Sequence, residues 1–343
     1  MYKIRKVWDL SLTYVGAVVG AGFASGQELM QFFVSSGSRG LWGALAAGLG
    51  FMLLGMLVFR LAARYRIASY REFLILLLGE RAGAIVDGWL SLYLFAGVVI
   101  MLAGCGAAFR EYFAMPTWLG VLTSTLVLLC ALLAQREGVL AFNAWLVPVM
   151  ILGILAVGVA AWPGEYPEAA AGGMEGSWTW VLSALLYVSY NMISGMVILV
   201  SLTNSHQREG ALGALLGGLL LGVLAWLLCA VLLGHYRLAG QWEVPLLQLA
   251  RQQSPFLGLL YALVLWLAML TSALVDALGL ALRLSGRRWS YPVTVVALLV
   301  IAAGFSHIGF SLLIKTLYPF FGYINLLVLA AVLVKAKQVY IAR

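Results

Sequence analysis

The sequence predicts an all-α membrane protein whose chain crosses the bilayer many times. Hydrophobic residues make up 64% of the 343 residues and charged residues only 10%, and the mean hydropathy is +1.01. Apolar runs recur along the whole chain, and most of them reach the about 20 residues that a helix needs to cross a bilayer. A soluble domain of this composition would leave far too much apolar surface in water. We therefore expect a polytopic helical bundle surrounded by lipid.

Ten apolar runs are counted as transmembrane helices. Their approximate limits are 8–34, 40–61, 84–112, 117–134, 139–162, 177–200, 210–233, 255–282, 290–306 and 309–335. An even number of spans puts both termini on one side of the membrane. We expect two repeats of five helices, the first in residues 1–162 and the second in residues 177–343.

The positions of the basic residues predict which side of the membrane faces the cytoplasm. The loop 162–178 contains three glutamates and no Lys or Arg, and its side of the membrane carries only a few basic residues: Arg39, Arg110, Arg237 and Arg251. The opposite side carries Lys3, Arg5, Lys6, Arg60, Arg64, Arg66, Arg71, Arg81, Arg136, Arg208, Arg283, Arg287, Arg288, Lys335, Lys337 and Arg343. The positive-inside rule then predicts a protein of the inner (cytoplasmic) membrane with both termini in the cytoplasm.

Several functional classes are disfavoured by the composition. The net charge of +8 follows from the asymmetry between the two sides, so we expect no nucleic acid as a partner. Cys105, Cys130 and Cys229 lie singly in apolar runs, without the spacing of a metal or disulfide site. We find no nucleophile with a base and no metal cluster, so we expect neither an enzyme nor an organic cofactor. Nothing in the sequence indicates the oligomeric state.

The first span contains a predicted break. Four glycines, at positions 16, 20, 22 and 26, lie within eleven residues of a segment otherwise long enough to cross a bilayer. Glycine costs about 1 kcal/mol relative to alanine inside a helix. Unwound backbone survives at membrane depth only where it is buried in protein or lines a polar cavity. The segment 15–29 therefore predicts a binding site, although glycines that only permit close helix packing are the alternative.

The sixth span carries polar residues in its middle, over the segment 187–196, and we predict a second break there. Because each repeat has five helices, the second must enter the membrane from the opposite side. Interrupted helices at matching places of two inverted repeats are typical of a transport site at the bilayer midplane.

Two connections between spans are too long to be simple turns. Residues 64–83 mix arginines with an apolar face, which predicts a cytoplasmic helix at the membrane surface. Residues 243–252 predict a short outer helix that caps an entrance, and Pro255 then begins the eighth span.

The eighth span offers oxygen ligands for a cation. Helical spacing puts Ala268, Ser272 and Asp276 on one line, with Thr271 beside it. Sodium is a hard cation that prefers oxygen, so the two hydroxyls and the carbonyls freed in the first span would form a cage. The alternative is that both hydroxyls bond to carbonyls of their own helix.

Together these features resemble the LeuT fold of the amino acid, polyamine and organocation superfamily. The motif Gly-Ala-Gly-Phe-Ala-Ser-Gly-Gln-Glu at 20–28 is most similar to the YkvI-like family of proposed amino acid permeases. Sodium-coupled members of the superfamily have a conserved Na⁺ site. The resemblance implies that in this chain the site is made by the hydroxyls of Thr271 and Ser272 and the carbonyls of Ala268, Gly16 and Val19.

The same resemblance implies a substrate site beside the first break. The amides of Gly20, Ala21 and Gly22 would hold a carboxylate of the substrate. The other expected contacts are Phe23, Tyr93, Tyr190, Asn191 and Ser194. Tyr93 could equally be plain packing. Sodium and neurotransmitter symporters have an arginine in this part of the first span, whereas this chain has Gly26-Gln27-Glu28.

Three charged residues within the spans are expected to be functional, since an intramembrane charge costs about 2.5–3.5 kcal/mol on insertion scales. We expect Glu28 and Lys315 to form an outer gate as an ion pair, with snorkelling of Lys315 to the surface as the alternative. If they do not interact, Glu28 would face the amine of the substrate. We expect Asp276 to draw the released cation into the inner vestibule.

The sequence thus predicts a secondary symporter that imports a small amino acid or related amine with Na⁺ by alternating access. One alternative is a proton-coupled or exchange transporter of an amino acid or organic cation that uses Glu28 or Asp276. An ion channel is a further alternative, but it would need a continuous polar path, whereas the polar residues gather at two breaks and one helix.

Overall fold

The computed structural model describes residues 2–67, 69–134, 138–163, 178–203, 207–286 and 289–341, and all regular structure within them is helical. The long helices are α4 (Arg39–Tyr65), α5 (Tyr70–Phe113), α6 (Thr117–Ala134), α7 (Gly138–Ala160), α8 (Thr179–Ser201), α9 (Gln207–Gly234), α12 (Pro255–Leu284), α13 (Tyr291–Phe305) and α14 (Phe310–Ile341). Shorter elements are α1 (Tyr2–Val18), α2 (Ala21–Ser25), α3 (Gln27–Phe32), α10 (Tyr236–Ala239), α11 (Pro245–Gln253) and two 3₁₀ turns, Val34–Ser36 and Ser306–Ile308.

In the described part of the chain, eight helices are long and apolar enough to cross a membrane, which agrees with the predicted polytopic helical bundle. The first predicted span falls outside this set because it is divided into α1, α2 and α3. Helix α7 contributes the shorter apolar stretch Leu146–Ala160. The count of ten spans, the division at 1–162 and 177–343, and the inverted repeats stay predictions.

The predicted break in the first span is present. Helix α1 ends at Val18 and α2 begins at Ala21, with Gly20 extended between them (φ −92°, ψ −176°). A second bend follows at Gly26, whose φ of +82° lies in the left-handed region that favours glycine. A Cβ at this position would come within 2.9 Å of Leu246 in α11. The glycines therefore divide one span into three short helices.

The predicted break in the sixth span is wrong, because α8 is one continuous helix from Thr179 to Ser201. Its polar side chains find partners without any unwinding. Ser189 Oγ donates to the carbonyl of Gly322 at 2.7 Å, and the amide of Asn191 donates to the carbonyl of Tyr187 one turn away at 3.1 Å. Buried polar groups that are hydrogen-bonded in this way do not require a distorted backbone.

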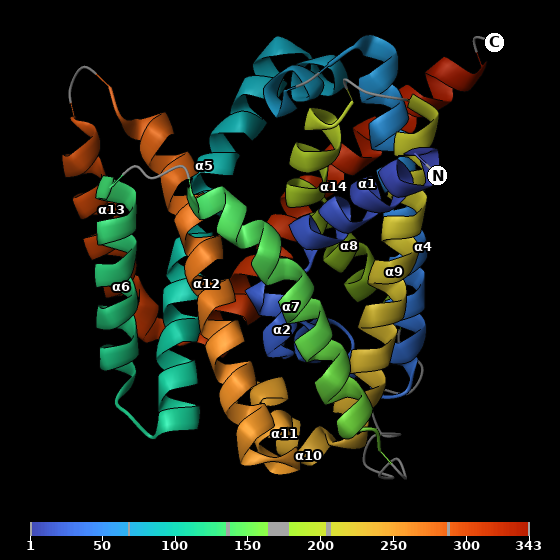
Figure 1. The fold of residues 1–343 in the computed structure, drawn as a ribbon. Helices are drawn as coiled ribbons and strands as arrows, with labels where there is room; N and C mark the ends of the chain where they lie inside the picture. The colour runs from blue at the N-terminus through green and yellow to red at the C-terminus, as the bar shows by residue number, and fades with distance from the viewer. Residues whose placement is uncertain are drawn as a thin grey trace.

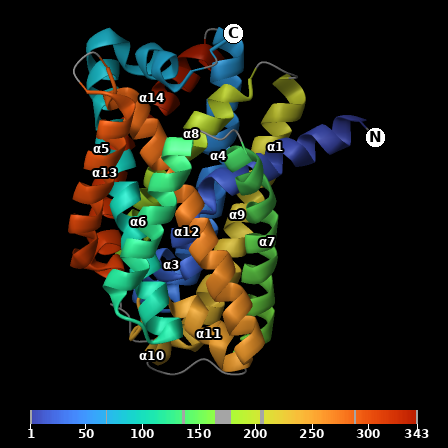
Figure 2. The same cartoon turned by 60° about the vertical axis from the view of Figure 1, so that its left-hand side comes forward.

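Close helix packing positions the broken span. Helix α4 packs along α9, and at their crossing a Cβ on Gly48 would lie 2.6 Å from the Cα of Gly222, so only glycine allows this approach. Helix α1 packs on α8 and α9, and α12 packs on α5 and α7. In Figure 2 the N-terminal part of α1 projects away from the bundle. The break between α1 and α2 therefore lies inside a frame of long helices.

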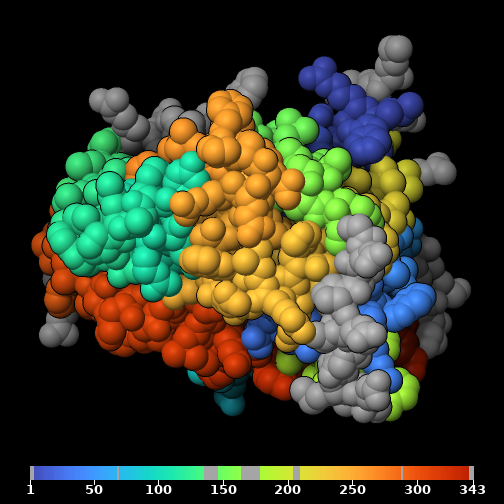
Figure 3. Space-filling model, turned by 90° about the horizontal axis from the view of Figure 1, so that it is seen from below, coloured from blue at the N-terminus to red at the C-terminus, as the bar shows by residue number. Residues whose placement is uncertain are grey.

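The two ends of the molecule differ. In Figure 1 both termini and the first part of α5 lie at one end, and α10 and α11 lie at the other. Figure 3 views that second end, where the golden α10–α11 segment covers the middle of the face. Residues 246–250 of α11 are buried, and Ser254 caps the start of α12 by accepting from the amide of Leu257 at 3.0 Å. A short helix is therefore found close to the predicted range 243–252, as Pro245–Gln253, and its place on the outer side of the membrane stays a prediction.

The predicted surface helix 64–83 has different limits. Helix α4 continues to Tyr65, and α5 begins at Tyr70 and bends at Gly79, which has a φ of +80°. The segment 70–78 is helical and buries Phe73 and Leu74, and its position at the membrane surface stays a prediction.

Some of the residues used to predict the orientation lie outside the described part of the chain. They are residues 164–177 of the loop 162–178, together with Arg136, Arg287, Arg288 and Arg343. The cytoplasmic location of the termini stays a prediction.

Candidate functional site

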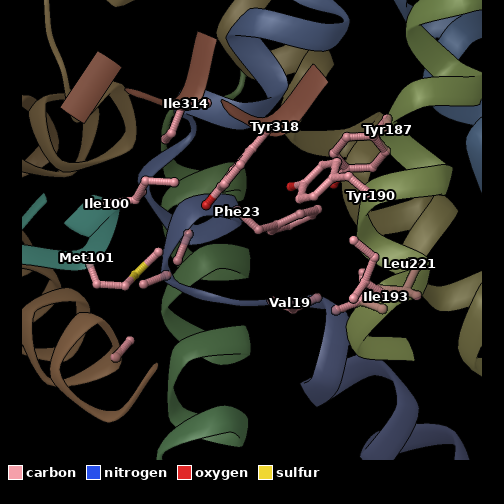
Figure 4. Packing of buried hydrophobic residues seen from close by; sticks show 14 of the residues in the cluster. Val19, Phe23, Ile100, Met101, Tyr187, Tyr190, Ile193, Leu221, Ile314 and Tyr318 are labelled. Carbon is pink, nitrogen blue, oxygen red and sulfur yellow. The ribbon is translucent and has the colours of Figure 1, made fainter. Parts of the chain in front are cut away.

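A cavity of about 320 Å³ lies beside the break in the first span. Helices α1, α2, α3, α5, α7, α8, α12 and α14 contribute to its walls. Figure 4 shows the surroundings of the break, with Val19 on the connection between α1 and α2. Fourteen of the sixteen residues predicted for the site line this cavity: Gly16, Val19, Gly20, Ala21, Gly22, Glu28, Tyr93, Tyr190, Asn191, Ser194, Ala268, Thr271, Ser272 and Asp276.

Two predicted residues do not line the cavity. Phe23 is 1% exposed and belongs to the apolar cluster around α2, so it packs the wall from behind. Lys315 is exposed on α14, whereas Glu28 is only 4% exposed. Among the described residues the ion pairs do not include one between these two. The predicted Glu28–Lys315 pair is therefore not formed, and the exposed lysine agrees with the snorkelling alternative.

Glu28 is held by aromatic residues instead. It lies in the first turn of α3, where the hydroxyl of Tyr190 donates to its Oε2 and the hydroxyl of Tyr318 also bonds to it. The rings of Tyr190 and Tyr318 stack with their centroids 4.5 Å apart, and Phe32 stacks on the other face of Tyr190 at 5.5 Å. Figure 4 shows Tyr190 and Tyr318 approaching each other from α8 and α14.

A glycine makes room for the Glu28 carboxylate. A Cβ built on Gly22 would lie 2.0 Å from Glu28 Oε1, so any larger residue would displace the carboxylate. The same Cβ would lie 3.1 Å from the hydroxyl of Tyr318. The sequence analysis missed Tyr318, which is one turn beyond Lys315 on α14. The only signal was a tyrosine before Pro319 in an apolar helix.

Asp276 lies in a similar notch on another wall. A Cβ built on Gly97 of α5 would lie 2.0 Å from Asp276 Oδ2, so the glycine again leaves the space for the carboxylate. On the same wall the hydroxyls of Tyr93 and Ser194 are 3.1 Å apart and hydrogen-bonded. Tyr93 also meets Phe321 edge to face at 5.2 Å. Tyr93 therefore joins α5 to α8 and α14 as well as lining the cavity.

The predicted sodium ligands also lie together. Among the described residues, the carbonyls of Gly16 and Val19 have no hydrogen-bond partner, because Val19 N bonds to Val15 O and Gly20 N bonds to Val18 O. Thr271 Oγ1 donates to the carbonyl of Ala268 at 3.1 Å, as the alternative predicted. This bond uses only the hydroxyl hydrogen, and its oxygen keeps lone pairs for a cation.

The charge of the cavity is one-sided. The described residues that line it include two carboxylates, Glu28 and Asp276, and no Lys, Arg or His. The lining also contains aromatic residues, whose ring faces can attract a cation. They are Tyr93, Tyr190, Tyr318 and Phe321. The field inside this cavity therefore favours positively charged groups.

The residues that line the two ends of the cavity differ in exposure. Toward α11, Ile100 and Met101 are buried, and Leu246 lies against Gly26. Toward the termini, Val275 is 40% exposed and Leu90 is half-buried.

Two carboxylates attach the α11 segment to the bundle. Glu111, near the end of α5, accepts from the backbone amides of Glu243 at 2.6 Å and Val244 at 3.1 Å. Glu243 in turn pairs with Arg110 at 3.1 Å and accepts from the amide of Phe310, the first residue of α14, at 3.0 Å. The α11 segment is thus bound to α5 and α14. The sequence analysis missed this network, whose partners lie far apart along the chain.

Comparison with solved structures identifies the fold. A variant of the manganese transporter from Eremococcus coleocola matches with a TM-score of 0.57 at 18% identity, over 93% of this chain and 76% of the transporter. Mhp1, a nucleobase-cation-symport-1 family transporter solved in a closed conformation with bromovinylhydantoin bound, matches with a TM-score of 0.57 at 16% identity, over 94% and 74%. The chain therefore has the LeuT-like fold that its sequence predicted.

Comparison of sequences identifies the family. No protein-family model matches the chain. The protein YyaD of Bacillus subtilis is 29% identical to it over 339 residues, which is 97% of each chain. The membrane protein YkvI of Bacillus subtilis is 31% identical over 333 residues, which is 95% of each chain. With this identity over nearly its full length, the chain belongs to the YkvI family of membrane proteins.

Proposed function

We propose that this protein is a secondary transporter that carries a small amine-bearing solute, coupled to a monovalent cation for which Na⁺ fits the ligands best. One observation carries the proposal. The cavity at the α1–α2 break has two carboxylates, free backbone carbonyls and aromatic faces, and no basic residue lines it in the part of the chain that the structure describes. A polar cavity of this kind inside an apolar bundle is typical of a solute site at membrane depth.

The solute chemistry follows from Glu28. A carboxylate buried to 4% exposure and bonded only by neutral phenols has acceptor capacity left for an ammonium group. The stacked rings of Tyr190 and Tyr318 beside it favour an organic cation. If the solute is an amino acid, its carboxylate would accept from the amides of Ala21 and Gly22 at the start of α2. An amine is therefore required, and a carboxylate is optional.

The coupling ion follows from the oxygens of α1 and α12. The carbonyls of Gly16 and Val19 and the hydroxyls of Thr271 and Ser272 all line the same cavity. Such neutral oxygens suit a hard monovalent cation. One Na⁺ moving down a potential of about 100 mV supplies about 2.3 kcal/mol, which corresponds to roughly fiftyfold accumulation of a solute.

Alternating access follows from the two ends of the cavity. We infer that this conformation is closed toward α11, where Leu246 rests on Gly26, and open toward the termini, where Val275 is 40% exposed. Transport requires the reverse arrangement as well, in which α11 no longer rests on Gly26. We propose that the bound solute and ion favour exchange between the two arrangements.

The test uses the full-length protein in proteoliposomes and in detergent. A panel of small amines and amino acids is screened by thermal unfolding with and without Na⁺, where a ligand at 100 times its dissociation constant adds about 2.7 kcal/mol of stability. Uptake of each radiolabelled hit is then measured with an inward Na⁺ gradient. Amine-bearing hits whose uptake needs the gradient support the proposal. Stabilisation only by solutes without an amine, or uptake indifferent to every ion gradient, would contradict it.

A second candidate is proton coupling, which the two cavity carboxylates favour because either could carry a proton. Uptake would then follow an inward pH gradient and persist when Na⁺ is replaced by choline. The same proteoliposomes distinguish the two candidates.

A further inference from the structure

The two cavity carboxylates belong to different parts of the bundle. Glu28 comes from α3 and lies against Gly22 of α2, whereas Asp276 comes from α12 and lies against Gly97 of α5. Each carboxylate has its own glycine notch, in which a Cβ would come within 2.0 Å of an oxygen. They therefore occupy two separate positions in one cavity.

Neither carboxylate has a cationic partner among the described residues. The ion pairs of this part of the chain join Arg110 to Glu111 and Glu243, and Arg283 to Asp87, all away from the cavity. The partners of Glu28 are phenols, which carry no charge. While the cavity is open, water can compensate both charges, but a cavity closed at both ends would trap two unpaired carboxylates in a low dielectric. Closure therefore needs positive charge from the cargo.

We propose that the closed, loaded cavity holds two positive charges at once, an ammonium group of the solute at Glu28 and a separate monovalent cation at Asp276. This inference rests on the proposed function and adds to it a charge count and a role for Asp276 in holding the cation. Asp276 is one helical turn from Ser272 on the same face of α12, so its charge acts on a cation held by the hydroxyls there. The aromatic stack at Glu28 suits the organic group instead.

The charge count constrains the cargo. An amine without a carboxylate, together with one cation, neutralises the cavity completely. A zwitterionic amino acid contributes no net charge, so it needs two accompanying cations to reach the same balance. The chain therefore moves a net cargo of two positive charges per cycle, whichever solute class it takes.

The experiment measures whether the two positions fill together. Radioactive sodium and a series of monoamines from methylammonium to butylammonium are bound to the purified full-length protein, and the tightest amine is used further. We expect saturating amine to leave sodium bound, and sodium to leave amine bound. Asp276→Asn should weaken sodium about tenfold or more and keep amine affinity, and Glu28→Gln should do the reverse. Because each variant keeps one ligand, that ligand reports correct folding.

Glu80→Gln is the matched control, since it removes one carboxylate from an exposed position of α5 outside the cavity. It should change neither affinity. Displacement of sodium by amine in a one-for-one manner would mean a single shared cation position and would overturn the inference. Unchanged sodium affinity in Asp276→Asn would also overturn it.

The second charge has two possible sources, a metal cation or a proton, and the same samples separate them. If amine binds to the wild type and sodium does not, proton uptake is measured in a weakly buffered solution as amine is added. Uptake of about one proton that Asp276→Asn removes supports a proton at this position, and amine binding without proton uptake contradicts the inference. If the wild type binds no amine of the series, the proposed function itself fails, which is a different result from any outcome in the variants.

Discussion

The first span and the sixth span look alike in sequence but differ in structure. Both have polar or small residues at mid-span, yet the first divides into α1, α2 and α3, whereas α8 is one continuous helix. The first span exposes backbone to the cavity, with the carbonyls of Gly16 and Val19 free. Helix α8 keeps a continuous helical backbone and contributes side chains such as Tyr190 and Ser194 to the lining. In this protein the broken span therefore offers free backbone carbonyls as well as the Glu28 side chain, whereas the α8 wall relies on side chains.

The largest expected effect comes from the glycines of the broken span. Gly22→Ala puts a Cβ where the Glu28 carboxylate lies, and a displacement of about 1 Å at a site can cost about 100-fold. We expect solute binding to fall by this order, measured by the thermal shift of the best amine. Gly20→Ala is the matched control, because a Cβ there meets nothing within 4 Å and its φ of −92° suits alanine. Equal losses in both variants would mean that the backbone break, and not the Glu28 notch, is what the glycines protect.

Two neighbouring residues test the side-chain wall of α8. Tyr190→Phe removes the hydrogen bond to Glu28 and keeps the ring, so we expect solute affinity to fall about tenfold, as for a bond to a charged group. Ser189→Ala removes the bond to Gly322 on the other side of the same helix, and should cost about 1 kcal/mol of stability with uptake retained. Uptake by each variant in proteoliposomes is compared with its thermal unfolding. If Ser189→Ala impairs uptake more than Tyr190→Phe, the α8 wall does not act through Glu28.

A smaller effect is expected at the proposed Na⁺ site, where backbone carbonyls and side-chain hydroxyls would bind the ion together. Thr271→Val keeps the shape of the side chain and removes one oxygen, while the carbonyls of Gly16 and Val19 remain. We expect the apparent Na⁺ affinity to fall roughly threefold to tenfold, since a net hydrogen-bond-like contact contributes about 1 kcal/mol. The measurement is uptake as a function of Na⁺ concentration. An unchanged Na⁺ dependence in both Thr271→Val and Ser272→Ala would remove the ion from this position.

The smallest effect is expected at Lys315. Its side chain is exposed, so Lys315→Met should leave uptake within about twofold of the wild type, as is usual for surface substitutions. Glu28→Gln in the same assay should impair uptake. A strong loss in Lys315→Met that the charge-swapped pair Glu28→Lys with Lys315→Glu recovers would restore the ion-pair gate.

The difference between the two spans also explains what the sequence could predict. The break in the first span follows from glycines at positions 16, 20, 22 and 26, a local signal that needs no knowledge of neighbours. The continuity of α8 depends on distant partners, since Ser189 bonds to Gly322 and Tyr190 bonds to Glu28. Partners of this kind cannot be read from the segment itself.

The partners of the charged residues could not be predicted from the sequence either. Counting residues gave Lys315 a depth similar to that of Glu28, but depth does not say which way a helix face points. One turn further along α14, Tyr318 is 7% exposed and bonds to Glu28, while Lys315 points outward. Helical spacing was sufficient to predict that Ala268, Thr271, Ser272 and Asp276 lie close together, because all four belong to one helix.

The attachment of α11 has a consequence for how this end of the bundle responds to solution conditions. Its polar bonds through Glu111 and Glu243 join it to α5 and α14, whereas its contact with Gly26 of the broken span, through Leu246, is apolar. If the α11 segment moves with α5 and α14, opening hydrates apolar surface and leaves the ionic bonds intact. The opening rate should then be nearly insensitive to ionic strength, slowed by excluded solutes such as sulfate or sucrose, and curved in its temperature dependence, as expected for a step that exposes apolar area and raises the heat capacity.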